Sequence, residues 1–247
     1  MKYPEDYINK VICGDCLEVM KGIPDNSIDL VVTDPPFNSE KKMGSPFRST
    51  SKNKLSEVEW FIYDKMSGRG YLRWLNMILK EIYRVGKEGS HIYMFSNWKS
   101  LRNLMDSLEI TLFTLNDVLT WDKKQFGIGF NYRPQTEFII FASKNKAKPL
   151  NSKDVPNIFR IKRVSNLDMN TLVQKPVELI KRLLSKASKE NHIVLDPFLG
   201  SGTTAVTCKQ LNRNFIGIEI NPEYCKIAEE RLRKVPERLD KFVEAVK

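Results

Sequence analysis

Short apolar runs alternate along this chain with stretches whose apolar residues recur at helical spacing, a pattern typical of an α/β protein. Apolar runs predict buried strands at 28–33, 91–95, 192–195 and 214–220, and two further strands at 118–121 and 137–141. Helical spacing predicts helices over residues 72–85, 101–108, 205–211 and 223–233. The expected fold class is therefore α/β, with a doubly wound, mostly parallel sheet and an antiparallel edge hairpin.

Asp34-Pro35-Pro36-Phe37, the DPPF motif, directly follows the predicted strand 28–33. It should therefore lie at the carboxyl edge of the sheet, where open α/β proteins bind ligands. A carboxylate and proline-fixed carbonyls suit the exocyclic amine of a planar base, and Phe37 suits stacking on that base. Two such acceptors favour a more tetrahedral amine nitrogen, whose lone pair points at an electrophile. The structural alternative is a stiff turn between a strand and a loop.

The predicted strand 192–195 leads into a glycine-rich turn, residues 196–204, and then into a helix. Glycine permits positive φ and close approach of a ligand, and Thr203 or Thr204 is expected to cap the helix. Glu219 ends the next strand, at the position of an acid that binds ribose hydroxyls. An NAD(P) site is the alternative, but Asp196 stands before the glycines and no second mononucleotide half follows. A phosphate-binding P-loop is excluded, because no Gly-Lys-Ser/Thr sequence follows.

The DPPF motif and the stretch 194–204 resemble the two signature motifs of S-adenosylmethionine-dependent DNA amino-methyltransferases. The catalytic motif comes first and the cofactor motif last, which resembles the permuted β group of that family. Cys13-Gly14-Asp15-Cys16 resembles the segment that contacts the cofactor's adenine, and Gln174-Lys175-Pro176 resembles the helix start that closes over its methionine moiety. Phe37 departs from the family, where Tyr is more common, and Thr171-Leu172 stand where His-Pro is often found.

This resemblance implies a Rossmann-like methyltransferase fold with S-adenosyl-L-methionine as cofactor. It implies a catalytic site made of Asp34, Pro35, Pro36 and Phe37, and a cofactor pocket made of Asp15, Cys16, Lys175, Asp196, Pro197, Phe198, Gly200, Gly202, Thr203, Thr204, Glu219, Ile220 and Asn221. The target base must be flipped out of duplex DNA, because a paired amine is out of reach of the methyl group. Adenine N6 is the favoured target and cytosine N4 the close alternative. RNA or protein-amide methylation, and a non-catalytic DNA-binding protein on this scaffold, are further alternatives.

The charge of the chain fits a nucleic-acid partner. Its 247 residues carry a formal net charge of +10, with a pI of about 9.3, which favours polyanions such as double-stranded DNA. We expect DNA contacts from Lys41, Lys42, Arg48, Lys123, Arg133, Arg160 and Arg163. The polar stretch 39–59 is expected to close over extruded DNA, with a plain solvated loop as the alternative. Cys13-x-x-Cys16 lacks a second closely spaced pair, so no metal site is expected.

Length and the lack of a linker predict a single methyltransferase domain over residues 1–247. Its parts would be a catalytic half at about 1–143, a short target-recognition insert at about 144–170 and a cofactor-binding half at about 171–235. No run of 18 apolar residues and no signal peptide is present, so the cytoplasm is the expected location. The resemblance also admits a homodimer and a partner restriction endonuclease.

Overall fold

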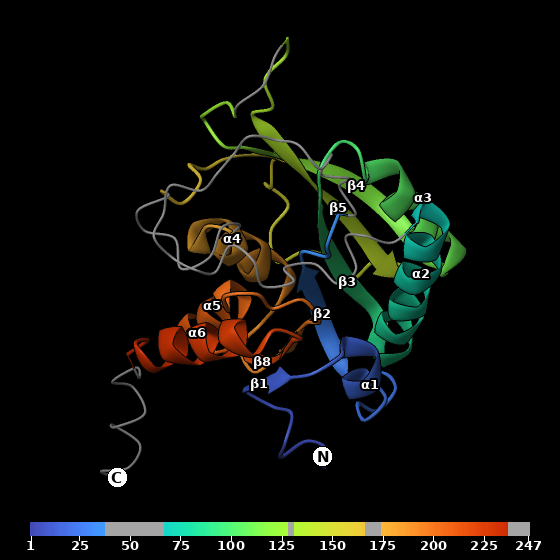
Figure 1. Cartoon of the computed structure of the whole chain (residues 1–247), viewed down its shortest axis with the longest axis vertical. Helices are drawn as coiled ribbons and strands as arrows, with labels where there is room; N and C mark the ends of the chain where they lie inside the picture. The colour runs from blue at the N-terminus through green and yellow to red at the C-terminus, as the bar shows by residue number, and fades with distance from the viewer. Residues whose placement is uncertain (38–66, 128–130, 166–173, 237–247) are drawn as a thin grey trace.

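A single mixed sheet of eight strands, in the order β1-β8-β7-β2-β3-β5-β4-β6, forms the centre of the molecule (Figure 1). The computed structural model describes residues 1–37, 67–127, 131–165 and 174–236. The strands are β1 (Lys10–Cys13), β2 (Ile28–Thr33), β3 (Gly86–Ser96), β4 (Phe113–Asp122), β5 (Thr136–Lys144), β6 (Ile158–Arg160), β7 (Ile193–Asp196) and β8 (Asn214–Glu219). β5 alone among them runs against its neighbours β3 and β4. The predicted mostly parallel sheet with an antiparallel hairpin is therefore confirmed.

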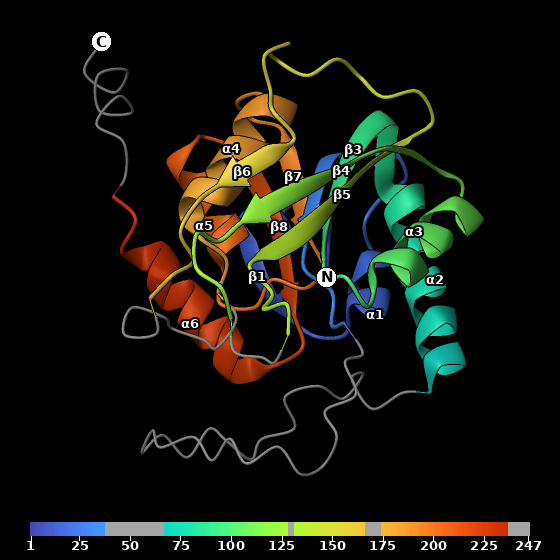
Figure 2. The ribbon, with the colours of Figure 1, turned by 90° about the horizontal axis from the view of Figure 1, so that it is seen from above.

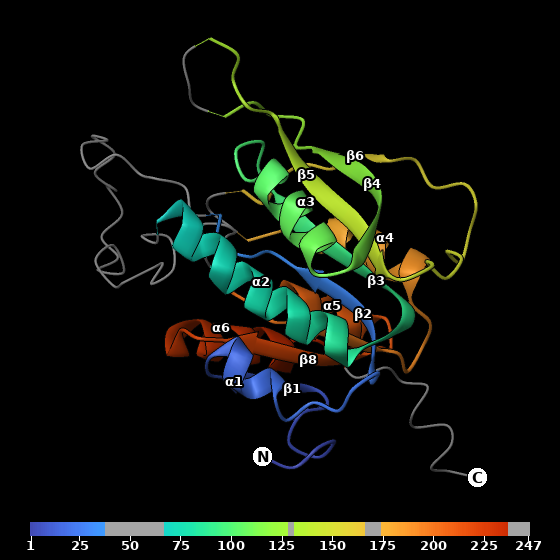
Figure 3. The same cartoon turned by 90° about the vertical axis from the view of Figure 1, so that its right-hand side faces the viewer.

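Helices cover both faces of this sheet, as a doubly wound fold requires (Figure 2). One face carries α1 (Cys16–Met20), α2 (Gly68–Val85) and α3 (Leu101–Ile110), and the other carries α4 (Val177–Ala187), α5 (Thr203–Gln210) and α6 (Pro222–Arg233). Figure 3 shows the first group in front of the strands and the second behind them. Two separate clusters of buried apolar side chains result, one on each face. No described helix is long and apolar enough to cross a membrane.

Local signals explain why these elements form where they do. The Ser67 hydroxyl accepts the Gly70 amide at 3.2 Å and so begins α2, whose buried Leu75, Ile78, Leu79 and Ile82 lie on one face. Full burial of each such side chain stabilises the fold by roughly 1.5–3 kcal/mol. The pattern that predicted a helix over 72–85 is therefore confirmed, with one more turn at its start.

The predicted cap of α5 is wrong. Gly202, in the left-handed region at φ +83°, is the N-cap, and neither Thr203 nor Thr204 caps the helix with its side chain. A Cβ at Gly202 would lie 2.7 Å from the Cβ of Ala228, so the glycine also lets α5 approach α6 closely. The sequence patterns also did not predict β1, α1 and β6, which have only three to five residues each.

Candidate active site

The carboxyl edge of the sheet gathers most of the predicted site residues. β2, β7 and β8 are parallel and end side by side, so Asp34, Asp196 and Glu219 reach the same edge. The Thr33 hydroxyl donates to Asp196 Oδ1 at 2.9 Å and ties the catalytic strand to the strand that carries the glycine-rich turn. Burial raises the pKa of Asp196 to about 7, so this link contains a carboxyl group that titrates near neutrality.

The DPPF motif is held by hydrogen bonds from two helical segments. The Tyr71 hydroxyl of α2 donates to the Pro36 carbonyl at 2.7 Å, and the Ser100 hydroxyl, just before α3, donates to the Phe37 carbonyl at 3.2 Å. No donor among the described residues reaches the Pro35 carbonyl. The motif is thus fixed on both sides, while no donor from the described part of the chain occupies its Pro35 carbonyl.

Asp34 has one engaged oxygen and one without a partner. Its Oδ2 is ion-paired with the Lys175 ammonium. Its Oδ1 is buried and has no hydrogen-bond partner within the described part of the chain. Burial raises the pKa of Asp34, and Lys175 opposes that rise. Since a buried acceptor without a donor costs about 1–3 kcal/mol, this geometry favours a ligand that brings an N–H group to Oδ1.

Lys175 belongs to a chain of charges that the sequence did not reveal. Its ammonium lies 3.5 Å from Glu137 Oε2, and Glu137 Oε1 accepts a hydrogen bond from Lys123 at 3.2 Å. Burial opposes the charge on Lys175, but Asp34 and Glu137 outweigh that effect and raise its pKa. Burial also opposes the charge on Glu137, where Lys175 and Lys123 outweigh it and lower the pKa. In the structure Lys175 pairs with Asp34 and Glu137, and Lys123 pairs with Glu137. The predicted contacts of Lys175 with the cofactor and of Lys123 with DNA stay predictions.

Glu219 and the glycine-rich turn form the part of the edge predicted to bind the cofactor. Glu219 Oε2 accepts the Gly200 amide and Oε1 accepts the Asn221 amide, each at 2.8 Å. Gly200 is left-handed at φ +55°, and a Cβ there would meet nothing within 4 Å, so the turn faces open space. A carboxylate oriented by two amides beside an open backbone fits the hydroxyl pair of a nucleoside ribose. The residues present therefore fit the predicted cofactor.

The remaining residues predicted for the cofactor pocket have varied surroundings. Asp15 caps α1 by accepting the Leu17 amide at 2.8 Å. Cys16 is buried in the core, where burial raises its pKa to about 12 and keeps the thiol neutral. The Phe198 ring packs 5.7 Å from Trp74, and Ile220 is partly exposed. A direct contact of these side chains with a cofactor stays a prediction.

Four of the residues predicted to bind DNA lie in the described part of the chain: Lys123, Arg133, Arg160 and Arg163. Arg133 stacks its guanidinium 4.1 Å from the Phe126 ring and donates to the Gly127 carbonyl at 2.7 Å. Arg160 and Arg163 are exposed. Lys41, Lys42 and Arg48, with the stretch 39–59, lie outside the described residues.

Sequence reasoning missed Thr33, Tyr71, Ser100 and Glu137 as members of the site. Each acts through a contact made far along the chain, such as the 163 positions between Thr33 and Asp196. A usable signal existed only for Glu137, an acid near the start of β5 that directly precedes the apolar run 138–142. An acid there invites a search for a buried cationic partner.

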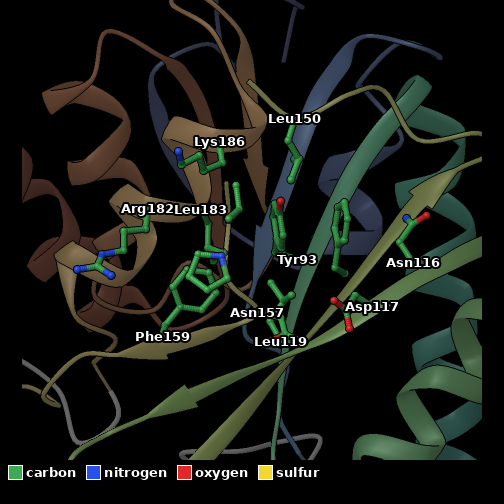
Figure 4. A pocket seen from close by; sticks show the side chains of 13 residues that line it. Tyr93, Asn116, Asp117, Leu119, Leu150, Asn157, Phe159, Arg182, Leu183 and Lys186 are labelled. Atoms are coloured by element: carbon green, nitrogen blue, oxygen red, sulfur yellow. The ribbon is translucent and has the colours of Figure 1, made fainter. Parts of the chain in front are cut away.

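A cavity of about 220 Å³ lies on the sheet face that α4 covers (Figure 4), and no residue of the DPPF motif lines it. Tyr93, Leu119, Phe159 and Leu183 give it an apolar lining, and Arg182 and Lys186 of α4 stand at its margin. None of its lining residues was predicted to be catalytic, cofactor-binding or DNA-binding, but five of them fall in the predicted target-recognition insert: Leu150, Val155, Pro156, Asn157 and Phe159.

Comparison with known proteins agrees with this geometry. Residues 28–230 match the family model of DNA methylases designated N6_N4_Mtase. The type II methyltransferase M.HpaI of Haemophilus parainfluenzae is 34% identical over 248 residues, which cover 90% of this chain and 74% of that protein. DNA adenine methyltransferase YhdJ of Escherichia coli K12 is 30% identical over 257 residues, which cover 90% of this chain and 82% of that protein.

Solved structures give the same result. The crystal structure of an M1.HpyAVI–SAM complex superposes with a TM-score of 0.66 at 26% identity, covering 90% of this chain and 98% of that one. The cytosine-N4-specific PvuII DNA methyltransferase superposes with a TM-score of 0.70 at 16% identity, covering 97% of this chain and 93% of that one, which shows the shared fold. The family match and the identity to M.HpaI show that the chain belongs to the DNA methylase family, whose members are S-adenosylmethionine-dependent DNA methyltransferases.

Proposed function

We propose that this chain methylates the N6 amine of an adenine flipped out of double-stranded DNA, with Asp34 as the residue that orients the amine. The observation that carries the proposal is the buried, unpartnered Asp34 Oδ1 next to a Pro35 carbonyl that no described donor reaches. An exocyclic amine has two N–H groups, and these two oxygens supply two acceptors.

Holding both hydrogens solves the chemical problem of this substrate. The amine lone pair is delocalised into the base, so the free amine is a weak nucleophile. Two fixed acceptors favour a more tetrahedral nitrogen and direct its lone pair away from the ring, and they act most strongly where water is excluded. Phe37 offers a ring on which the base stacks, an interaction worth roughly 1–3 kcal/mol. Bound S-adenosylmethionine supplies an electrophilic methyl group on a sulfonium.

Asp34 also has a role once the new bond has formed. The methylated nitrogen carries one proton too many, and Asp34 Oδ1 is the acceptor that already faces an N–H. Because burial raises the pKa of Asp34, its carboxylate is a better proton acceptor than an exposed one. No covalent bond between enzyme and base is required, since the sequence lacks a Pro-Cys nucleophile motif.

Adenine is favoured over cytosine because YhdJ, at 30% identity, is named a DNA adenine methyltransferase. The grip described above would also suit the N4 amine of cytosine, which has similar electronics. The test must therefore identify which base of the DNA carries the new methyl group.

The test is transfer of a tritiated methyl group to unmethylated duplex DNA, followed by digestion to nucleosides and mass spectrometry. N6-methyladenine in the digest, lost in an Asp34→Asn variant that still binds S-adenosylmethionine by calorimetry, is the expected result. N4-methylcytosine would overturn the choice of base. Label found only in RNA or protein would overturn DNA as the substrate, and an active Asp34→Asn enzyme would overturn the assigned role.

Partners follow from the substrate. We expect double-stranded DNA to bind across the carboxyl edge and the exposed Arg133, Arg160 and Arg163, and we expect the enzyme to act in the cytoplasm. A homodimer and a partner restriction endonuclease stay predictions, and light scattering of the purified protein with and without DNA tests the first.

A further inference from the structure

Four charged side chains from four separate segments form one line that ends at Asp34. Lys123 follows β4, Glu137 lies in β5, Lys175 precedes α4 and Asp34 follows β2. The links are Lys123 to Glu137 at 3.2 Å, Glu137 to Lys175 at 3.5 Å, and the contact of Lys175 with Asp34. β4 ends and β5 begins at the edge where β2 ends, so the topology itself brings these residues together.

The line is shielded from water and balanced in charge. Its side chains are only 11–25% exposed, and two cations alternate with two carboxylates. The Lys175 ammonium also lies 5.0 Å from the centre of the Phe95 ring and 6.0 Å from that of the catalytic Phe37. Aromatic faces attract a cation, so they favour this one position for the ammonium.

We propose that Lys175 and Glu137 are positioning residues for methyl transfer: Lys175 holds Asp34 Oδ2 so that Oδ1 alone faces the substrate amine, and Glu137 holds Lys175 in place. This inference rests on the role of Asp34 proposed above. It adds two residues that do not touch the reacting atoms, and it gives Lys123 the task of orienting Glu137.

Stability alone does not account for such a line. Removing charges from water costs several kcal/mol per ion, and apolar residues of similar volume often stabilise a fold as well or better. A carboxylate with two free oxygens, by contrast, can rotate and offer either oxygen. The amine would then bind in more than one orientation, and its lone pair would not have a fixed direction. Fixing one oxygen removes that freedom before the substrate arrives.

The line also affects the pKa of Asp34, and Lys175 and Glu137 shift that pKa in opposite directions. The charged groups that act on Asp34 are Lys175, which lowers its pKa, and Glu137, which raises it, while Asp196 faces it from β7. The acidic limb of the pH–rate profile reports the ionisation of Asp34. Loss of the Lys175 charge should raise the pKa of Asp34 and move this limb to higher pH. Loss of the Glu137 charge should move that limb to lower pH. A purely structural role would not shift the limb in opposite directions.

The experiment is single-turnover methylation of duplex DNA across pH 5–9 with Lys175→Met, Glu137→Gln and Asp34→Asn, and with S-adenosylmethionine affinity measured by calorimetry. We expect Lys175→Met and Glu137→Gln to lower the rate on the order of tenfold or more, with cofactor affinity nearly unchanged and with opposite shifts of the acidic limb. The matched control is Lys87→Met, which removes a lysine–aspartate pair of 2.7 Å from the other end of β2 and should leave the rate unchanged.

Failure of this inference differs from failure of the proposed function. An active Asp34→Asn enzyme overturns the role of Asp34 and the inference with it. If Asp34→Asn is inactive while Lys175→Met and Glu137→Gln keep the wild-type rate and pH profile, only the positioning role is overturned. A faster Lys175→Met enzyme also overturns it, because the lysine would then compete with the substrate amine. The positioning role is also overturned if either variant loses S-adenosylmethionine affinity while the acidic limb of its pH–rate profile does not shift. Should Lys175→Met fail to fold, Glu137→Gln carries the test by itself.

Discussion

Asp29 and Asp34 lie near the two ends of the same strand, β2, and each pairs with a lysine. At the amino end, Asp29 Oδ1 binds Lys87 at 2.7 Å and Oδ2 accepts the Ile193 amide at 3.0 Å. At the carboxyl end, Asp34 Oδ2 binds Lys175, but Oδ1 is buried without a partner among the described residues. The Asp29 side chain is 9% exposed and that of Asp34 is 25% exposed, so the deeper carboxylate is the fully satisfied one.

This difference separates a structural carboxylate from a functional one. A buried acceptor without a donor weakens the fold, and proteins pair nearly all such groups. Asp29 follows that rule and joins β2 to β3 and β7. Asp34 breaks it at the edge where parallel sheets bind ligands, which is where an unpaired acceptor has a use. The substitutions below test whether the two aspartates divide stability and activity in this way.

The largest effect should come from Asp34→Asn, which keeps the shape of the side chain but replaces one acceptor oxygen with an amide donor. We expect kcat to fall roughly 100- to 1,000-fold, as when one preorganised group at a reacting centre is removed. S-adenosylmethionine affinity should change little, and the loss in free energy of unfolding should be limited because Glu137 still pairs with the Lys175 ammonium. Calorimetry and urea unfolding measure these two quantities, and a loss of activity explained by unfolding would contradict the assignment.

Asp196, the buried last residue of β7, should contribute to stability in a way that depends on pH. Its carboxyl pKa is raised by burial to about 7 in the folded state, so its protonated form favours folding. That contribution is complete at acidic pH and is lost as pH rises, by up to about 1.4 kcal/mol for each pH unit from about pH 4 to about pH 7. Asp196→Asn cannot ionise and should escape this loss. Its stability relative to wild type should rise from pH 5 to pH 8 in urea unfolding, and parallel curves would contradict the prediction.

Asp29→Asn should show the reverse of Asp34→Asn. It weakens the contact with Lys87 and turns an amide donor toward either that cation or the Ile193 N–H. We expect the free energy of unfolding to fall by about 1–2 kcal/mol, with kcat changed less than about twofold. A drop in kcat similar to that of Asp34→Asn, at a temperature where the variant is folded, would remove the distinction between the two ends of β2.

Much of this arrangement was predictable because it depends on local signals. The strand 28–33, followed by Asp34, was predicted with the bounds that the structure shows. The helix predicted over 223–233 is α6, which begins one residue earlier, at Pro222, after the cap Asn221, whose side chain accepts the Glu223 amide at 2.9 Å. In each case a few neighbouring residues determine the backbone, and the chemistry of the exposed edge follows from where the strand ends.

The partners of Asp34 were not predictable in the same way. Lys175 is 141 positions away from Asp34, and no local sequence pattern around either residue predicts that they pair. Lys123 was expected on DNA because it lies in a stretch where basic residues are interleaved with Phe, Tyr and two glycines, which suits backbone contacts and base stacking. In the structure its side chain is only 18% exposed and pairs with Glu137. A sequence pattern shows which residue types reach an edge, whereas the pairing of charges at that edge depends on how the loops fold over it.

The smallest effect that still tests the comparison is Tyr71→Phe. This change removes only the hydroxyl that donates to the Pro36 carbonyl at 2.7 Å and keeps the ring against Trp74. One such hydrogen bond contributes about 1 kcal/mol, so kcat should fall about fivefold if the bond fixes the motif in the reactive geometry. Tyr83→Phe is the matched control, because it removes a hydroxyl from the same helix whose bond, to Asn145 at 3.1 Å, lies away from the motif. Steady-state kinetics of both variants measure this effect. Equal kcat values for Tyr71→Phe and Tyr83→Phe would show that the DPPF motif keeps its geometry without the hydrogen bond from α2. The two ends of β2 would then differ only in the charges around them.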